Sequence, residues 1–159
     1  MELQRTAQQA TDLLLQKGMT VSLAESCTGG MIAAALVGCP GVSEALLEGC
    51  VCYSNEAKQR TLGVLTETLR DHGAVSAECA LEMVHGICDY TGSDTAIAVT
   101  GIAGPGGGTA EHPVGTVYMA IATEHGAQAS RLELNDIGRE AVRMEATASV
   151  FRALLTTLS

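Results

Sequence analysis

Three short segments carry most of the side chains that could do chemistry: residues 24–30, 53–58 and 100–109. The first places Ser26 between an apolar run typical of a strand and a run typical of a helix. The second supplies a tyrosine and a lysine five positions apart, and the third is rich in glycine. A serine needs a base to become a nucleophile, and the oxyanion that then forms needs backbone N–H donors. Together the segments favour a serine hydrolase.

Ser26 has two interpretations at this stage. A serine just before a helical run is most often an ordinary N-cap residue. Alternatively, Gly29 and Gly30 allow close approach to the backbone, and the unpaired N–H groups from Thr28 to Gly30 would hold an oxyanion. We therefore take Thr28, Gly29 and Gly30 as candidate substrate-binding residues. The pattern is not G-x-S-x-G, so the nucleophile elbow of an α/β-hydrolase is not indicated.

Lys58 is either the base for Ser26 or an ordinary solvated lysine. A base must be neutral near pH 7, and moving the pKa of a lysine that far costs roughly 4–5 kcal/mol, which burial or a nearby cation must supply. No Ser-x-x-Lys motif is present, so the pair would have to form across the fold. Tyr53 ends a predicted strand, where its ring can serve for packing alone or its hydroxyl can orient Ser26 or relay a proton.

The glycine-rich loop follows an apolar strand-like run, at the edge of a sheet where ligands usually bind in such folds. It lacks the Lys-Ser/Thr pair of a P-loop, so the phosphate cradle of that motif is not indicated. Arg139 and Arg143 lie one turn apart on a predicted helix. They are either solvated charges paired with neighbouring glutamates or a clamp for a substrate phosphate.

The composition limits the classes of partner. The chain has 159 residues, 47% hydrophobic and 17% charged, as in a globular protein large enough to bury a core. Its net charge of −9 repels phosphate backbones and anionic lipids, so we expect neither nucleic acid nor a membrane as a partner. A single phosphate group can still bind to a local arginine or a helix N-terminus.

The six cysteines and four histidines show no metal-ligand spacing, so we expect no metal and no cofactor. The thiols are best interpreted as buried and free. The first residues are polar and helix-like and do not match a secretory leader. These observations predict a cytoplasmic protein.

Hydrophobic periodicity predicts alternating helices and strands. Helices are expected over residues 2–17 and 31–37, from an Asn55 N-cap to near Gly63, from a Ser76 cap to about Tyr90, and over about 138–158. Strands are expected over residues 19–25, roughly 45–53 and 94–100, with an antiparallel hairpin of 114–123 and 129–134. This order predicts one domain over residues 1–159, with an α/β layered sheet that is mixed and mostly parallel.

Residues 23–30, 53–60 and 98–105 are similar to three motifs of the CinA C-terminal domain family, the family of bacterial nicotinamide mononucleotide deamidases. The resemblance extends from the first helix to the last, including residues 113–117 and the arginines of the final helix. It covers essentially the whole chain, and three long motifs in the same order do not arise easily by chance.

The resemblance implies a three-layer α/β/α fold and hydrolysis of the carboxamide of nicotinamide mononucleotide to nicotinic acid mononucleotide and ammonia, within pyridine nucleotide recycling. The family's serine nucleophile falls on Ser26, its lysine on Lys58 and its motif tyrosine on Tyr53. A further substrate-site motif matches the segment from residue 100 to 108, which marks as substrate-binding residues Thr100, Gly101, Gly104 and Gly106. A small-molecule nucleotide is then the expected partner, and a homo-oligomer the expected assembly.

One position and one segment depart from the family's pattern. His112 stands where the family commonly has a lysine, and residues 135–139 align only loosely with the usual Gly-Asp/Asn-Arg start of the last helix. A catalytically silent nucleotide-binding module with the same glycine loop is the alternative function, and a structural interaction protein is a third. The silent module would bind the nucleotide without releasing ammonia, and the structural protein would bind no nucleotide.

Overall fold

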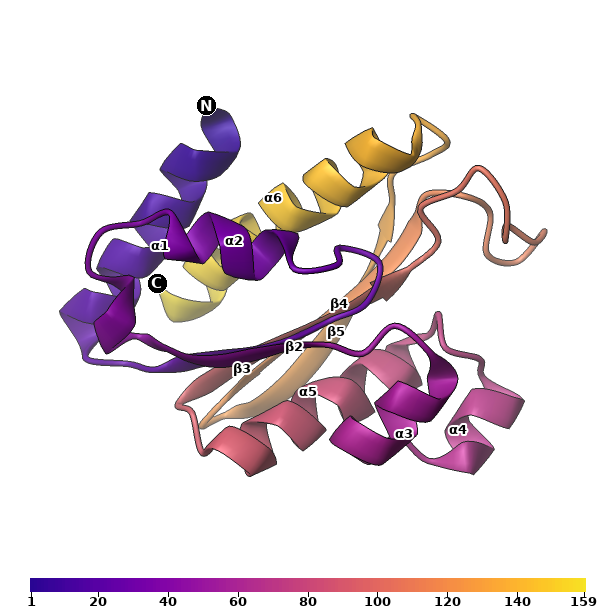
Figure 1. Cartoon of the computed structure of the whole chain (residues 1–159), viewed down its shortest axis with the longest axis horizontal. Helices are drawn as coiled ribbons and strands as arrows, with labels where there is room; N and C mark the ends of the chain where they lie inside the picture. Colours follow the sequence, from indigo (N-terminus) through magenta and orange to yellow (C-terminus); the bar gives the residue numbers. More distant parts are fainter.

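In the computed structural model, which describes all 159 residues, a five-stranded sheet lies between two layers of helices (Figure 1). Its spatial order is β2-β1-β3-β4-β5, and the strands are β1 (Val21–Glu25), β2 (Leu46–Val51), β3 (Thr95–Gly101), β4 (Thr116–Thr123) and β5 (Gly126–Glu133). β1 pairs in parallel with β2 and β3, whereas β4 pairs antiparallel with β3 and β5. The sheet is therefore mixed, as predicted, and only β4 runs against the other strands.

The two helix layers pack on different kinds of side chain. One layer is formed by α1 (Glu2–Lys17), α2 (Met31–Val37) and α6 (Arg139–Leu158), and the other by α3 (Asn55–Leu62), α4 (Thr66–Asp71) and α5 (Ala77–Thr91) (Figure 1). Large side chains such as Leu23 and Ile97 face the first layer, while alanines such as Ala24, Ala96 and Ala98 face the second. Small residues on that face let α5 approach the sheet closely. The predicted α/β/α architecture is confirmed.

Most predicted elements lie where they were expected, with three differences. Ser54, rather than Asn55, is the N-cap of α3, because its Oγ accepts a hydrogen bond from the N–H of Ala57 at 3.1 Å. The hairpin turn is shorter than predicted, and β5 begins at Gly126. Two short elements were not predicted, α4 and the 3-10 helix η1 (Val42–Glu44).

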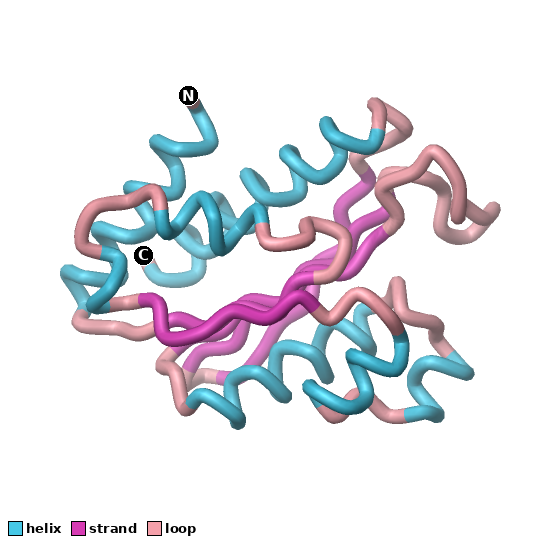
Figure 2. Tube along the Cα trace, in the orientation of Figure 1, coloured by secondary structure: helices cyan, strands magenta, loops and turns pink.

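The parallel strands determine where a site can form. β1, β2 and β3 end at the same edge of the sheet, so residues 26–30, 52–54 and 102–115 meet there. The last of these is the long loop that extends beyond the sheet between β3 and β4 (Figure 2). No helix combines the length and the apolar character needed to cross a bilayer.

Candidate active site

The loops at the carboxyl edge surround a pocket of about 280 Å³. Of the residues selected from the sequence, those that line it are Ser26, Tyr53, Lys58, Thr100, Gly101, Gly104, Gly106 and Arg139. The lining residues that were not predicted are Cys27, Asn55, Ala74, Val75, Ile102, Ala103 and Gly107. The lining contains no aspartate and no glutamate.

Lys58 and Ser26 are in direct contact inside this pocket. The Nζ of Lys58 lies 3.0 Å from the Oγ of Ser26. The same amine donates to the backbone carbonyl oxygens of Cys52 at 3.0 Å and Tyr53 at 3.2 Å. Lys58 is only 2% exposed and takes part in none of the ion pairs of the protein. The pair forms across the fold, between the end of β1 and the helix after β2.

Helix α3 brings the amine to this place. It begins directly after β2 with the Ser54 cap, so the carbonyl groups just before the helix lie beside the amine one turn into it. α3 packs against α5, where Gly86 lies at the point of closest approach. A Cβ at Gly86 would stand 2.0 Å from the carbonyl oxygen of Leu62. This glycine therefore allows the position of the helix that carries Lys58.

The surroundings of Lys58 favour its neutral form. Burial lowers the pKa of Lys58 from its ordinary value of 10.5, because the ammonium loses hydration without gaining a carboxylate partner. A neutral amine can donate its two hydrogens to the two carbonyl groups and accept the proton of the Ser26 hydroxyl with its lone pair. Burial raises the pKa of the neighbouring Cys27 thiol to about 11, so this cysteine stays protonated at neutral pH. The nucleophilic group in contact with the amine is therefore the hydroxyl of Ser26.

Glu25 holds the turn that contains Ser26. Its carboxylate, only 1% exposed, accepts four hydrogen bonds of 2.6–3.2 Å, from the Thr28 hydroxyl and the N–H groups of Gly30, Ile32 and Ala33. The prediction that the N–H of Gly30 is open to a ligand is therefore wrong, because a side chain of the protein occupies the start of α2. Glu25 was not selected from the sequence. A glutamate ending an apolar strand directly before a helix was the signal for it.

Arg143 supports the same turn. Its Nε donates to the carbonyl oxygen of Cys27 at 3.0 Å, and its Nη2 donates to that of Thr28 at 3.1 Å. Gly29 has a φ of +59°, and a Cβ there would lie 3.2 Å from this guanidinium. Four residues expected to bind substrate shape the turn and do not line the pocket: Thr28, Gly29, Gly30 and Arg143.

Arg139 lines the pocket, whereas Arg143 does not. Its Nη1 donates to the carbonyl oxygen of Gly104 at 2.7 Å, and its Nη2 donates to the hydroxyl of Tyr53 at 3.0 Å. It therefore connects the loop after β2 with the loop after β3. The predicted clamp of two neighbouring arginines is not present. The Tyr53 hydroxyl bonds to Arg139 and makes no hydrogen bond with Ser26.

The loop after β3 forms the other wall. Thr100 is 1% exposed, and its Oγ1 donates to the carbonyl oxygen of Ala74 at 2.9 Å, which fixes the segment before α5 against the strand. Gly104 has a φ of +81°, and a Cβ there would meet Val114 at 2.5 Å. His112 lies outside the pocket, with its ring edge-on to that of Tyr118.

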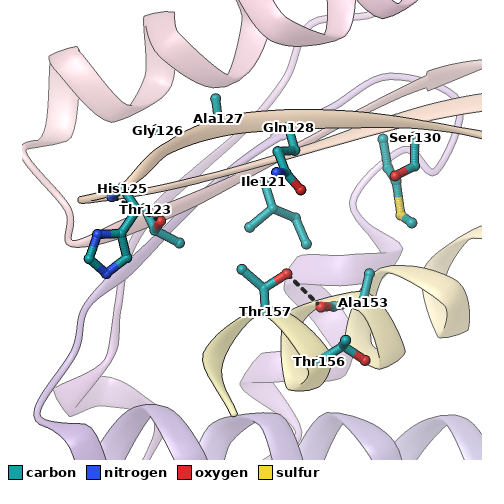
Figure 3. A pocket seen from close by; sticks show the side chains of 11 residues that line it. Ile121, Thr123, His125, Gly126, Ala127, Gln128, Ser130, Ala153, Thr156 and Thr157 are labelled. Carbon is teal, nitrogen blue, oxygen red and sulfur yellow. Dashed lines mark hydrogen bonds between the residues drawn. The ribbon is translucent and has the colours of Figure 1, made fainter.

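A larger pocket, of about 500 Å³, lies between the β4–β5 hairpin and the C-terminal half of α6 (Figure 3). It is at the opposite edge of the sheet, because β4 begins beside the end of β3 and finishes beside its start. Small polar residues such as Thr123, Ser130 and Thr157 line it, and Thr157 bonds to the carbonyl oxygen of Ala153 (Figure 3). It contains no lysine or arginine, whereas Lys58 and Arg139 both line the smaller pocket.

A serine in contact with a buried lysine at the carboxyl edge of this α/β/α fold is an arrangement that can activate a nucleophile. The model of the CinA C-terminal domain matches residues 3–158, and the chain belongs to that family.

Relatives and solved structures agree with this assignment. The chain is 48% identical over 148 residues to a CinA-like protein of Shewanella pealeana, covering 93% of the chain and 35% of the relative. It is 61% identical over 109 residues to a putative competence-damage inducible protein of Clostridium perfringens, covering 69% of the chain and 26% of the relative. The chain thus spans about a quarter to a third of these relatives.

Among solved structures, a competence/damage inducible protein of Agrobacterium tumefaciens superposes with a TM-score of 0.97 at 41% identity, covering 100% of this chain and 97% of the other. A CinA superfamily protein of Escherichia coli superposes with a TM-score of 0.93 at 29% identity, covering 99% and 90%. Both structures therefore share the fold of this chain with little change.

Proposed function

We propose that the protein is an amidohydrolase that converts nicotinamide mononucleotide to nicotinic acid mononucleotide and ammonia. The observation that carries the proposal is the 3.0 Å contact between the Lys58 amine and the Ser26 hydroxyl, in a pocket without a carboxylate. Membership of the CinA C-terminal domain family, whose deamidases the sequence motifs resemble, supports the choice of substrate.

In the proposed reaction, neutral Lys58 accepts the proton of Ser26 as its Oγ attacks the carboxamide carbon. The tetrahedral intermediate collapses when the resulting ammonium gives its proton to the departing nitrogen, which leaves as ammonia. The nicotinoyl ester on Ser26 is then hydrolysed by a water molecule that Lys58 deprotonates. Water is consumed, and one acid and one ammonia are released.

The oxyanion needs donors that the fold has not already used. The N–H of Gly29 donates to the carbonyl oxygen of Ser26, and that of Gly30 donates to Glu25. The N–H groups of Cys27 and Thr28 have no acceptor within the protein. We assign the oxyanion to the N–H of Cys27, because Cys27 follows the nucleophile directly and lines the pocket.

The phosphate requires a cation, since the protein carries a net charge of −9. Arg139 is the arginine that lines the pocket, and its present partners are two neutral oxygens that a phosphate can replace. A guanidinium binds phosphate with charge-assisted, bidentate hydrogen bonds. We assign the phosphate to Arg139 and leave Arg143 to the Ser26 turn.

Ammonia release from the mononucleotide tests the proposal. The purified protein should release ammonia and nicotinic acid mononucleotide in equal amounts, and Ser26→Ala should abolish both while retaining substrate binding. Ser43→Ala, an exposed serine in η1, is the matched control and should behave like the parent. Binding of the mononucleotide without ammonia would overturn the proposal in favour of a silent nucleotide-binding module. No binding would favour a structural protein.

A further inference from the structure

We propose that the ring of Tyr53 is the platform on which the pyridinium ring of the substrate stacks, which makes Tyr53 a specificity-determining residue. This inference rests on the proposed function, because it concerns how that substrate is held. The first ground is position. The backbone carbonyl of Tyr53 bonds to the Lys58 amine beside Ser26, and its hydroxyl bonds to Arg139.

Tyr53 therefore reaches from the reacting centre at one end to the phosphate-binding guanidinium at the other. A nicotinamide mononucleotide with its carboxamide at Ser26 and its phosphate at Arg139 must place its pyridinium and ribose in the interval between them. The phenol ring occupies one side of that interval. Before substrate binds, Arg139 positions the hydroxyl end of the ring, while Lys58 positions the backbone of the same residue through its carbonyl oxygen.

The second ground is charge. The pyridinium ring is a cation, whereas the pocket lining holds no carboxylate to neutralise it. Tyr53 is the one aromatic residue of the lining, in a chain with one Phe, three Tyr and no Trp. The residue is 61% exposed, so its side chain is accessible to a ligand. An aromatic face attracts a cation through the ring quadrupole, and more strongly when water is excluded.

A platform of this kind has a defined kinetic signature. The charge of the pyridinium stays on the ring while the carboxamide carbon is attacked, so the platform binds the ground state and the transition state alike. Loss of the ring should therefore raise KM about tenfold and leave kcat within about a factor of two. Loss of a residue that oriented the nucleophile would instead lower kcat and leave KM nearly unchanged.

The sharpest test compares two forms of one ligand. Ser26→Ala serves as the parent, so that nothing is turned over, and calorimetry measures the binding of nicotinamide mononucleotide and of its reduced 1,4-dihydropyridine form. The two ligands share the carboxamide, ribose and phosphate, but the reduced ring is uncharged. Tyr53→Leu removes the aromatic face, and Tyr53→Phe keeps it while losing the bond to Arg139. Tyr90→Leu, at a tyrosine 71% exposed on α5, is the matched control.

Tyr53→Leu should weaken binding of the oxidised form about tenfold and lower its preference over the reduced form at least about fivefold. Tyr53→Phe and Tyr90→Leu should keep that preference. An unchanged preference in Tyr53→Leu, including equal weakening of both ligands, would overturn the platform and leave the proposed function standing. A parent that binds neither ligand would overturn the proposed function and the platform with it.

Discussion

Two buried charged side chains flank Ser26, and their surroundings assign them opposite roles. Glu25 and Lys58 are 1% and 2% exposed. Glu25 accepts four hydrogen bonds, three of them from N–H groups at the start of α2, so its charge is compensated. Lys58 bonds only to neutral oxygens, and burial lowers its pKa. A compensated buried carboxylate stabilises a turn, whereas a buried amine without a carboxylate partner can accept a proton in its neutral form.

Replacing Lys58, the buried amine without a carboxylate partner, should give the largest change in activity. Lys58→Met keeps a side chain of similar length but removes the base, so turnover should fall about 10³-fold or more. The free energy of unfolding should change little, because relief from burying a polar amine offsets the loss of the donor to the carbonyl groups of Cys52 and Tyr53. Ammonia release and urea unfolding measure the two effects. Lys58→Arg should not rescue turnover, since a guanidinium cannot act as the base.

Activity in Lys58→Met within a few-fold of the parent would remove lysine from the mechanism. A large loss of stability in the same variant would instead place Lys58 with Glu25, as a structural charge.

The two arginines of α6 also differ in expected role, one in binding substrate and the other in stabilising the Ser26 turn. Arg139→Ala should raise KM for the mononucleotide about ten- to a hundredfold, because a charge-assisted phosphate contact is lost. The unphosphorylated riboside, if it is turned over, should be unaffected.

Arg143→Ala should instead lower the free energy of unfolding by about 1–3 kcal/mol, because two carbonyl groups of the Ser26 turn lose their donors. Steady-state kinetics and urea unfolding of both variants measure the difference. An unchanged KM in Arg139→Ala would move the phosphate to the backbone of the glycine-rich loop.

Replacing Glu25, whose charge is compensated, should have a smaller effect, and this effect should appear in the free energy of unfolding. Glu25→Gln keeps the shape but replaces one acceptor oxygen with an amide that faces a backbone N–H. Leaving one buried donor unpaired should lower the free energy of unfolding by about 1–3 kcal/mol. Glu48→Gln, at an exposed glutamate of β2, is the control and should change it by less than about 0.5 kcal/mol. Equal effects of the two substitutions would show that the Glu25 network contributes little.

The two regions also differ in how far they could be predicted from the sequence. Helical periodicity located α1, an apolar run located α2, and the apolar run of β3 indicated a strand buried on both faces. The order of these elements was enough to predict the layers and to bring the ends of the parallel strands together. Ser26 and Lys58 could therefore be paired, because both follow strands that end at one edge.

The details of the turn could not be predicted in the same way, because they depend on contacts between residues distant in the sequence. Gly29 and Gly30 suggested an open anion site, but the carboxylate of Glu25 closes it. One-turn spacing placed Arg139 and Arg143 together, whereas one bonds to Gly104 and the other to Cys27. Spacing along a helix predicts that two side chains share a face. It does not predict which hydrogen-bond acceptors each side chain contacts.

The central claim, that buried Lys58 is the neutral base for Ser26, is tested most directly by the pH dependence of kcat/KM for the mononucleotide. Deprotonated Lys58 is the active form, so kcat/KM should rise tenfold per pH unit and level off at an apparent pKa below 10.5, the direction in which burial moves this lysine. The low-pH limb should disappear in the residual activity of Lys58→Met. A flat profile, or a rise that continues to pH 10.5 and is retained in Lys58→Met, would contradict the claim.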